Sequence, residues 1–349
     1  MRAIDFFCGG GGTTRGLLNA GIEVLAGVDI CDDYRQTYEE NNHCVFLAKS
    51  ITDITRDDIL ALIPNIDVAN DVLFTGCAPC QPFSQQRNIP EEHRDRNLLI
   101  EFGNVIEAYR PAYVLVENVP GIKGRGGDVF QRFLAILDRL EYRRMYSVLN
   151  AKDYGVPQNR NRLVLIASRV TDVMLPQPEY GKDGMPYRTV ADAIANYPPI
   201  EAGQQCDFVS NHKAARLVDL NLRRIRATEH DGGSRTSWPA ELMLECHKSK
   251  SAGHTDVYGR MAWNSVSPTL TSKCCSLSNG RFGHPEQDRA ISFREAAALQ
   301  SFPDDYVFYG VSESIIGRQI GNAVPVLLAE ALGRTLLEME EHFLNNQDE

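Results

Sequence analysis

A cysteine that closely follows a predicted strand is the first candidate for chemistry. Cys80 comes a few residues after the apolar run Asp71–Phe74, in the sequence Ala78-Pro79-Cys80-Gln81. The thiolate is the nucleophilic form of cysteine, and nearby positive charge or a helix terminus favours it. In isolation, however, a cysteine at such a place is more often a small buried apolar residue. Other segments must therefore decide whether Cys80 is a nucleophile.

Two further segments carry charged side chains next to predicted strands. Glu117 directly follows the apolar run Tyr113–Val116, where a carboxyl group could hold or deliver a proton. Arg160 and Arg162 precede the run Leu163–Ala167, and side chains at positions i and i+2 of an extended segment share one face. These arginines could orient the cysteine loop and the glutamate, or bind the carbonyl of a base. Read alone, Glu117 is explained equally well as a solvated residue at a strand end.

A glycine-rich segment follows the first predicted strand. The run Ala3–Phe7 leads into Gly9–Gly12 and then into helical spacing over Thr14–Asn19, an arrangement that lets a nucleotide-like ligand approach the backbone. Asp29 ends the second predicted strand, Gly21–Asp29, at the distance of about 20 residues that suits an acid binding ribose hydroxyls. The spacing does not separate NAD from S-adenosylmethionine. A tight glycine turn without a ligand is the alternative.

The segments that must position these residues alternate between strand-like and helix-like patterns in the first half of the chain. With a helix also expected over Asn97–Tyr109, this alternation predicts an α/β fold with a parallel, doubly wound sheet. From Val170 to about Asp304 the chain is rich in Pro, Gly, Ser and Asn, and few regular elements are expected. A short helix is predicted over Ser292–Gln300 and a long amphipathic helix over Val326–His342.

Composition places the chain among ordinary globular proteins. It has 349 residues, 43% of them apolar and 23% charged, and no apolar stretch approaches the roughly 20 residues that cross a bilayer. The N-terminus runs directly into the first predicted strand, so we expect no signal peptide, no membrane association and a cytoplasmic location. Nine scattered cysteines indicate reduced thiols. The pair Cys77-x-x-Cys80 suits neither a zinc site nor a thioredoxin-like motif, and no metal is expected.

The net charge of −10 does not decide whether the chain binds nucleic acid. Whole-chain charge governs solubility and steering, whereas binding depends on one face. Between Lys213 and Arg260 the local balance reverses, because basic residues outnumber the acidic ones among them. The basic residues are Arg223, Arg224, Arg226, Arg235, Lys248 and Lys250. A solvated surface of mixed charge explains this segment equally well.

Taken together, the motifs resemble the DNA (cytosine-5)-methyltransferase family, of the bacterial or phage type with a short target-recognition region. The resemblance covers nearly the whole chain, and its blocks occur in the family's order. These blocks are Phe7–Gly12, Pro79-Cys80-Gln81, Glu117-Asn118-Val119, Gln158–Arg162, Ser267–Thr271, Arg294–Ala297 with Gln300–Pro303, and Arg318–Pro325. A chance match of so many ordered blocks is very improbable.

The resemblance implies a mechanism, with S-adenosyl-L-methionine as the cofactor and double-stranded DNA as the partner. Cys80 would add to carbon 6 of a flipped-out cytosine, and Glu117 would hydrogen-bond or protonate N3. Arg162 would contact the base carbonyl, with Arg160 supporting its loop. Methyl transfer to carbon 5, loss of the C5 proton and elimination of the cysteine would leave 5-methylcytosine and S-adenosyl-L-homocysteine.

The resemblance also implies which residues bind the cofactor and the DNA. The cofactor residues are Phe7, Gly9, Gly11, Asp29, Ile30, Ser50, Pro79, Leu98, Asn322 and Ala323. The DNA residues are Gln81, Ser84 and Arg235, and Arg235 could read a base, bind a phosphate or only cover the core. Ser50 departs from the family, which usually carries an acid before Ile-Thr. Either Ser50 substitutes for it, or Asp53 moves in, or adenine recognition is looser.

The implied organisation is a Rossmann-like catalytic domain and a smaller, irregular one. We expect a catalytic, S-adenosylmethionine-binding domain over residues 1–168, a target-recognition domain and hinge over 169–304, and a C-terminal segment over 305–349 that returns to the catalytic domain. A cognate restriction endonuclease is a further expected partner. One active site per chain needs no second copy, so a monomer is expected.

Three other functions explain part of the sequence. A tRNA cytosine-5 methyltransferase of the same fold would share the chemistry of Cys80 and Glu117. A silent nucleotide-binding or regulatory module would have no need of Cys80, Glu117 and Arg162 together. An NAD-dependent oxidoreductase rests on the glycine loop alone and leaves Pro79-Cys80-Gln81 unexplained.

Overall fold

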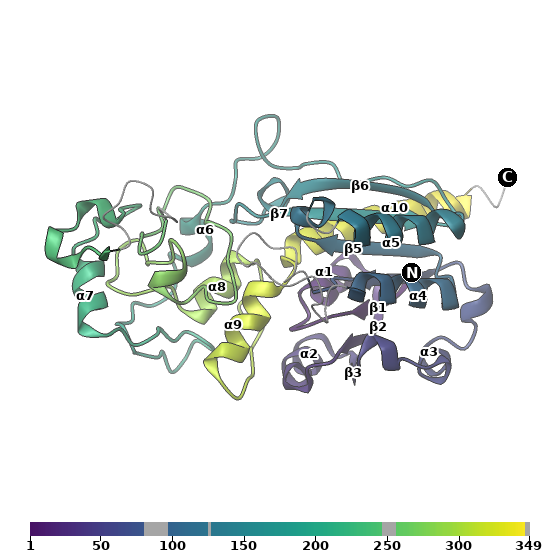
Figure 1. Ribbon diagram of the computed structural model, residues 1–349, viewed down its shortest axis with the longest axis horizontal. Helices are drawn as coiled ribbons and strands as arrows, with labels where there is room; N and C mark the ends of the chain where they lie inside the picture. Colours follow the sequence, from purple (N-terminus) through teal and green to yellow (C-terminus); the bar gives the residue numbers. More distant parts are fainter. Residues whose placement is uncertain (80–96, 125–126, 246–255, 346–349) are drawn as a thin grey trace. The chain divides into compact units, whose positions relative to one another are not determined.

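A computed structural model describes residues 1–79, 97–124, 127–245 and 256–345 (Figure 1). The chain forms two compact units. The first comprises Met1–Asn150, Asn161–Pro178 and Val324–Glu349, and the second comprises Ala151–Arg160 and Glu179–Ala323. The chain therefore passes between the units four times, and the short stretch 151–160 belongs to the second unit although sheet strands flank it on both sides.

A mixed sheet of seven strands forms the centre of the first unit. Its strands are β1 (Arg2–Phe6), β2 (Glu23–Asp29), β3 (Val45–Ala48), β4 (Val72–Gly76), β5 (Tyr113–Asn118), β6 (Arg143–Asn150) and β7 (Asn161–Ser168). Their order is β3-β2-β1-β4-β5-β7-β6. The first five in this order pair in parallel, as the alternating pattern predicts.

The prediction of an entirely parallel sheet is wrong at β6 and β7. β7 pairs antiparallel with both β5 and β6. Only the short stretch 151–160, without an α-helix, connects β6 to β7. A connection of this length can join antiparallel neighbours, whereas parallel neighbours need a longer crossover.

Helices cover both faces of this sheet. They are α1 (Gly12–Ala20), α2 (Arg35–Asn42), α3 (Arg56–Leu62), α4 (Leu98–Tyr109), α5 (Gly127–Arg139) and α10 (Val326–Asn345). The α4–α5 pair lies on one face and the α1–α10 pair on the other (Figure 1). The first helix and the last one touch closely, because a Cβ atom built on Gly16 would lie 2.4 Å from the Cβ atom of Ala329. No larger residue fits at position 16 without a shift of α10.

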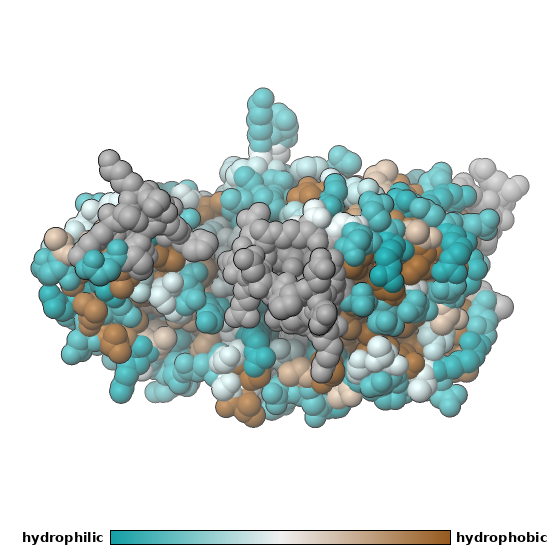
Figure 2. All heavy atoms as spheres, viewed as in Figure 1, coloured by the Kyte–Doolittle hydropathy of each residue, from teal (hydrophilic) through white to brown (hydrophobic). Residues whose placement is uncertain are grey.

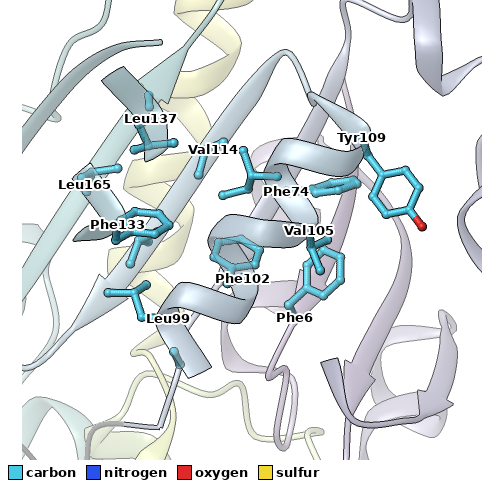
Figure 3. Packing of buried hydrophobic residues seen from close by; sticks show 14 of the residues in the cluster. Phe6, Phe74, Leu99, Phe102, Val105, Tyr109, Val114, Phe133, Leu137 and Leu165 are labelled. Carbon is cyan, nitrogen blue, oxygen red and sulfur yellow. The ribbon is translucent and has the colours of Figure 1, made fainter. Parts of the chain in front are cut away.

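Aromatic and aliphatic side chains fill the space between the sheet and α4 (Figure 3). Phe6 of β1 lies with its ring centroid 5.1 Å from that of Phe74 and 5.4 Å from that of Phe102. Leu99 and Val105 of α4 belong to the same cluster. Burial of each such side chain stabilises the fold by roughly 1.5–3 kcal/mol, so this cluster firmly holds the strands whose ends carry the predicted site.

The second unit has few regular elements, as predicted. Its helices are α6 (Val190–Ile194), α7 (Asp219–Arg226), α8 (Phe293–Leu299) and α9 (Glu313–Asn322), and no strand is assigned among its described residues. α8 begins with a capping box in which the Ser292 hydroxyl accepts from the Glu295 N–H and the Glu295 carboxylate accepts from the Ser292 N–H. The predicted helix over Ser292–Gln300 is therefore confirmed.

Buried arginines connect the loops of the second unit. Arg260 is fully buried and donates hydrogen bonds to the main-chain carbonyls of Ile225, Thr228, His284 and Gln287. One guanidinium carries five N–H donors, so it can satisfy the carbonyls of several segments at once. Burial lowers the pKa of Arg260 from its usual value.

A second buried arginine is paired with a carboxylate. Arg289 binds both oxygens of Glu295 at 2.7 Å and also donates to the carbonyl of Ile200. Burial alone would raise the pKa of Glu295, but the hydrogen bonds and charge of Arg289, with smaller contributions from His284 and the Ser292 N–H, together outweigh burial and lower it. The pair is therefore charged in the folded protein.

Hydrophilic residues cover much of the face of the molecule drawn in Figure 2. Figure 2 shows hydrophobic residues in small separate groups on the visible face. Of the helices that the structure describes, no single one has both the length and the apolar composition to cross a membrane; α9 and α10 meet these criteria only when taken together.

Candidate active site

The predicted site lies where the strand order of the first unit reverses. β1 and β4 are neighbours, and the chain builds outward from them in opposite directions, through β2 and β3 on one side and β5 on the other. In open α/β sheets ligands bind at this point, beyond the carboxyl ends of the strands. Three segments meet that description: residues 7–12 after β1, residues 77–79 after β4, and Glu117 with Asn118 at the end of β5.

Two neighbouring side chains hold the carboxylate of Glu117, one through an ion pair and one through a hydrogen bond. The side chain is only 6% exposed, and its Oε1 atom forms an ion pair with Nε of Arg162 at 2.8 Å. Its Oε2 atom accepts a hydrogen bond from the Cys77 thiol at 2.8 Å. The antiparallel register pairs Glu117 with Val164, so Arg162 lies diagonally opposite on the neighbouring strand, within reach of a long side chain.

The residue after Glu117 holds the main chain that leads to Cys80. The side-chain amide of Asn118 donates to the Ala78 carbonyl at 3.1 Å and accepts from the Val119 N–H at 2.9 Å. Pro79 follows and is half-buried. Cys80 itself, together with Gln81 and Ser84, lies outside the described residues, so the placement of these three predicted site residues stays a prediction.

The glycine loop has the backbone conformation of a close-approach turn. Phe7, Gly9 and Gly11 have φ angles of 61°, 53° and 85°, in the left-handed region that residues other than glycine adopt rarely. A Cβ atom built on Gly9 would meet no atom within 4 Å, so this side of the loop faces open space. The strain at Phe7 is of the kind that clusters at ligand sites.

Asp29 fixes this loop against the end of β2. Its Oδ2 atom accepts from the Gly9 N–H at 3.0 Å, and its Oδ1 atom accepts from the Cys31 N–H at 2.9 Å. Burial raises the pKa of Asp29 above its usual value. The next residue, Ile30, is an apolar side chain that is 64% exposed. A carboxylate and an exposed aliphatic surface therefore lie side by side at the edge of the glycine loop.

The other cofactor residues predicted in the first unit lie on separate elements. Ser50 precedes a 3-10 turn, and its hydroxyl lies 2.9 Å from that of Thr52, which in turn donates to Asp53 at 3.3 Å. Ser50 and Asp53 are thus linked through Thr52. Leu98 is the first residue of α4 and is half-buried.

The remaining predicted residues lie in the second unit. Arg160 is 2% exposed, and its guanidinium donates to the carbonyls of Leu270, Gly321 and Ala323 at 2.9, 3.2 and 3.0 Å. These bonds fit the predicted role of Arg160 as a support for its loop. Asn322 ends α9 and is exposed, and Ala323 follows it.

Arg235, the predicted DNA-binding arginine, is only 7% exposed and begins a 3-10 turn capped by Ser234. Of its three predicted alternatives, covering the core matches this burial most simply. Its role in DNA binding stays a prediction.

A buried polar chain that the motifs did not predict underlies the glycine loop. The Thr14 hydroxyl lies 2.8 Å from Oδ2 of Asp5 and 2.9 Å from the Tyr38 hydroxyl. Burial raises the pKa of Asp5 to about 7, and the hydrogen bond from Thr14 only partly offsets it. Burial also raises the pKa of Tyr38. Asp5 therefore titrates near neutral pH next to the loop.

Cys77 and Asn118 are the site residues that sequence reasoning missed. Cys77 was considered only as half of Cys77-x-x-Cys80, a spacing that suggested a metal site or a redox pair. Its position, one residue after a strand that neighbours the glutamate strand, was the signal that could have identified it as a partner of Glu117.

Comparisons with known proteins identify the family. The family model described as C-5 cytosine-specific DNA methylase matches residues 1–338. The type II methylase M.HgiDII of Herpetosiphon aurantiacus is 42% identical over 99% of this chain and 96% of its own length. The type II methyltransferase M1.HphI of Haemophilus parahaemolyticus is 34% identical over 96% of this chain and 86% of its own length.

Solved structures show the same fold. A protein encoded within an E. coli prophage has a TM-score of 0.75 at 21% identity, over 98% of this chain and 99% of its own. The S. pombe Dnmt2 methyltransferase has a TM-score of 0.65 at 18% identity, over 97% of this chain and 98% of its own. The family match over residues 1–338 and the two relatives above identify the protein: it belongs to the C-5 cytosine-specific DNA methylase family and is a DNA cytosine-5-methyltransferase.

Proposed function

We propose that the enzyme methylates a flipped-out cytosine in duplex DNA through a covalent bond between Cys80 and carbon 6 of the base. The observation that carries the proposal is the cluster at the carboxyl ends of β4 and β5. There Glu117 is buried and held by Arg162 and Cys77, and Asn118 binds the main chain two residues before Cys80. A buried carboxylate held from two sides next to a cysteine loop suits base recognition and nucleophilic addition.

The glycine loop suits S-adenosyl-L-methionine. The open side of Gly9 leaves room for a ligand to approach the backbone, and Phe7, Gly11 and Pro79 would line the same space. Asp29 uses one acceptor position on each oxygen for the loop, which leaves a second on each for ribose hydroxyls. Ile30 offers an exposed apolar surface to the adenine.

The other cofactor contacts are less direct. Ser50 and Leu98 would add contacts within the first unit, and only the family resemblance assigns Asn322 and Ala323 to the cofactor. The bound cofactor supplies an electrophilic methyl group on a sulfonium.

The chain's own residues would carry the remaining chemistry. The Cys80 thiolate adds to carbon 6, the C5–C6 double bond opens, and Glu117 supplies a hydrogen bond or a proton at N3 as electron density moves onto the ring. Arg162 orients Glu117 and contacts the base carbonyl. After carbon 5 has gained its methyl group, a base removes the C5 proton and the electron pair re-forms the double bond as the Cys80 thiolate leaves. If Glu117 has given a proton to N3, that proton returns to Glu117 as the neutral 5-methylcytosine forms, and both residues are then regenerated.

The second unit would recognise the target sequence. Its described residues are loop-rich, and loops on a firmly held scaffold commonly carry recognition. Gln81 and Ser84 would face the DNA near the extruded base, and Arg235 would contribute only if binding uncovers it. The type II relatives suggest a cognate restriction endonuclease in the same system. We further propose a monomer that acts in the cytoplasm.

A mechanism-based adduct tests the covalent step. The full-length protein is incubated with S-adenosylmethionine and duplex DNA that contains 5-fluorocytosine, where fluorine blocks the final elimination. We expect a complex that survives denaturing electrophoresis and that Cys80→Ser abolishes. An adduct that persists in Cys80→Ser would exclude Cys80 as the nucleophile.

Substrate class and target sequence need separate measurements. Transfer of a labelled methyl group should be far faster to duplex DNA than to total tRNA; the reverse order would favour the tRNA alternative. Bisulfite sequencing of host DNA that carries the expressed gene should show protected cytosines in one sequence context. Unmodified cytosines throughout would contradict the proposal.

A further inference from the structure

We propose that the Cys77 thiol is a positioning group of the active site, which fixes the second carboxylate oxygen of Glu117 while Arg162 fixes the first. This inference rests on the proposed function, in which Glu117 binds the N3 side of cytosine. It gives a role to a thiol that the covalent mechanism leaves unused.

The geometry makes the two contacts complementary. Nε of Arg162 lies 2.8 Å from Oε1, and the Cys77 sulfur lies 2.8 Å from Oε2. The terminal torsion of a glutamate is broad, so one contact alone lets the carboxylate plane rotate. An ion pair on Oε1 and a hydrogen bond on Oε2 together restrict that rotation. Each oxygen still has a second acceptor position, so Glu117 remains able to bind the base.

The main chain around Cys77 is held independently of its side chain. The Cys77 N–H donates to the Phe6 carbonyl at 3.4 Å, and the Ala78 carbonyl accepts from Asn118 at 3.1 Å. Replacing the thiol therefore leaves the course of residues 77–79 in place. A variant at position 77 thus tests the side-chain contact with Glu117 rather than the loop.

Three variants separate the donor from the volume of the side chain. Cys77→Ala and Cys77→Val both remove the donor, and valine keeps most of the volume; Cys77→Ser keeps a donor. Because hydrogen bonds to charged groups are worth more than neutral ones but a thiol is a weak donor, we expect kcat to fall about tenfold in the two donor-free variants. Cys77→Ser should recover most of this loss. The KM values for DNA and S-adenosylmethionine should stay unchanged, because the contact proposed for the Cys77 thiol is with Glu117 and with neither substrate.

The pH dependence of kcat gives a readout that a merely structural residue would not move. A carboxylate that loses a donor takes up a proton more readily. The limb of the kcat profile that Glu117→Gln removes should therefore shift to higher pH in Cys77→Ala and Cys77→Val, and return in Cys77→Ser. Cys44→Ala serves as the matched control, because Cys44 is also a half-buried cysteine but its thiol donates to the Asn42 carbonyl and not to Glu117.

The outcomes are distinct. Wild-type kcat and pH profile in both donor-free variants would overturn the inference, as would a Cys77→Ser enzyme no faster than Cys77→Ala. In either case Cys80→Ser should still abolish the 5-fluorocytosine adduct, which leaves the proposed function intact. An adduct that persists in Cys80→Ser would instead remove the proposed function, whatever the Cys77 variants do.

Discussion

The two compact units satisfy their buried polar groups in different ways. In the first, a seven-stranded sheet pairs the main-chain groups, and the largest fully buried side chains are aromatic. They include Phe6, Phe74, Phe102, Phe130, Phe133, Tyr38 and Tyr113. In the second, no strand is assigned among the described residues, and the largest fully buried side chains include Arg160, Arg260, Arg289 and Arg294.

These arginines satisfy main-chain carbonyls of loops, as strand pairing satisfies the main-chain groups of a sheet. All four donate to main-chain carbonyls, and together they connect segments that are far apart in the sequence. A loop-rich unit can therefore have a defined structure without regular elements if charged donors are buried in it. We expect different substitutions and different changes of pH to destabilise the two units.

The largest effect is expected at the buried ion pair of the second unit. Arg289→Met leaves the Glu295 carboxylate buried without its partner, which should cost about 3–5 kcal/mol of stability. Both tryptophans of the chain, Trp238 and Trp263, lie in this unit, so their fluorescence during urea unfolding reports on it selectively. Adding Glu295→Gln to Arg289→Met should recover part of the loss. A single variant that unfolds at the wild-type urea concentration would contradict the importance of the pair.

The two units should respond to pH with opposite signs. The folded pKa of Asp5, about 7, lies above the unfolded value of 3.8, so the folded state binds an extra proton in this window and the first unit loses stability as pH rises through it. Burial lowers the pKa of His284 to about 4 from 6.5, so the second unit loses stability as pH falls through that window. Each change is on the order of 3–4 kcal/mol across its window.

Two isosteric variants isolate these effects. Asp5→Asn should flatten the pH dependence of amide hydrogen exchange in β1, and His284→Asn should flatten that of the tryptophan-detected transition. Parallel pH profiles for both units in the wild-type protein would argue against the opposite signs. A profile that each variant leaves unchanged would exclude these two groups as its cause.

Substitutions of Arg160 and Arg162, which are two residues apart, should have smaller effects that differ from each other. Arg160→Met removes donors from three carbonyls in the second unit and should lower its stability by about 1–3 kcal/mol. Arg162→Met should leave the tryptophan-detected transition unchanged but lower kcat by about tenfold to a hundredfold, because it releases the Glu117 carboxylate. If the two variants changed the tryptophan-detected transition and kcat equally, Arg160 and Arg162 would not have separate structural and catalytic roles.

Much of the first unit was predictable because its signals are local. The short apolar runs that end at Phe7, Asp29, Phe74, Val116 and Ala167 all became strands, since a buried strand needs little more than such a run with turn residues beside it. The helix α4 matched its predicted range within one residue. The strand β6 was not predicted, because it lies at the edge of the sheet and carries mixed side chains. The antiparallel end of the sheet was therefore not predicted either.

The site was predictable where chemistry and strand ends coincide. Arg160 and Arg162 were expected either to orient the cysteine loop and Glu117 or to bind a base carbonyl, and Arg162 forms an ion pair with Glu117. The partners that depend on tertiary contacts were not predictable. Two such contacts join residues from different elements: the thiol contact of Cys77, and the polar chain of Asp5, Thr14 and Tyr38. No spacing in the sequence indicates either of them. The same is true of the buried arginines, which resemble surface residues until their acceptors are known.

The contact between the first helix and the last has a consequence for synthesis of the protein. α1 begins within the glycine loop, and the residue that packs on Gly16, Ala329, belongs to α10 near the other end of the chain. A ribosome makes α1 well before α10. A nascent chain therefore cannot complete the packing of the glycine-loop helix until α10 has emerged. Chains that stop before α10 should lack this support for the helix.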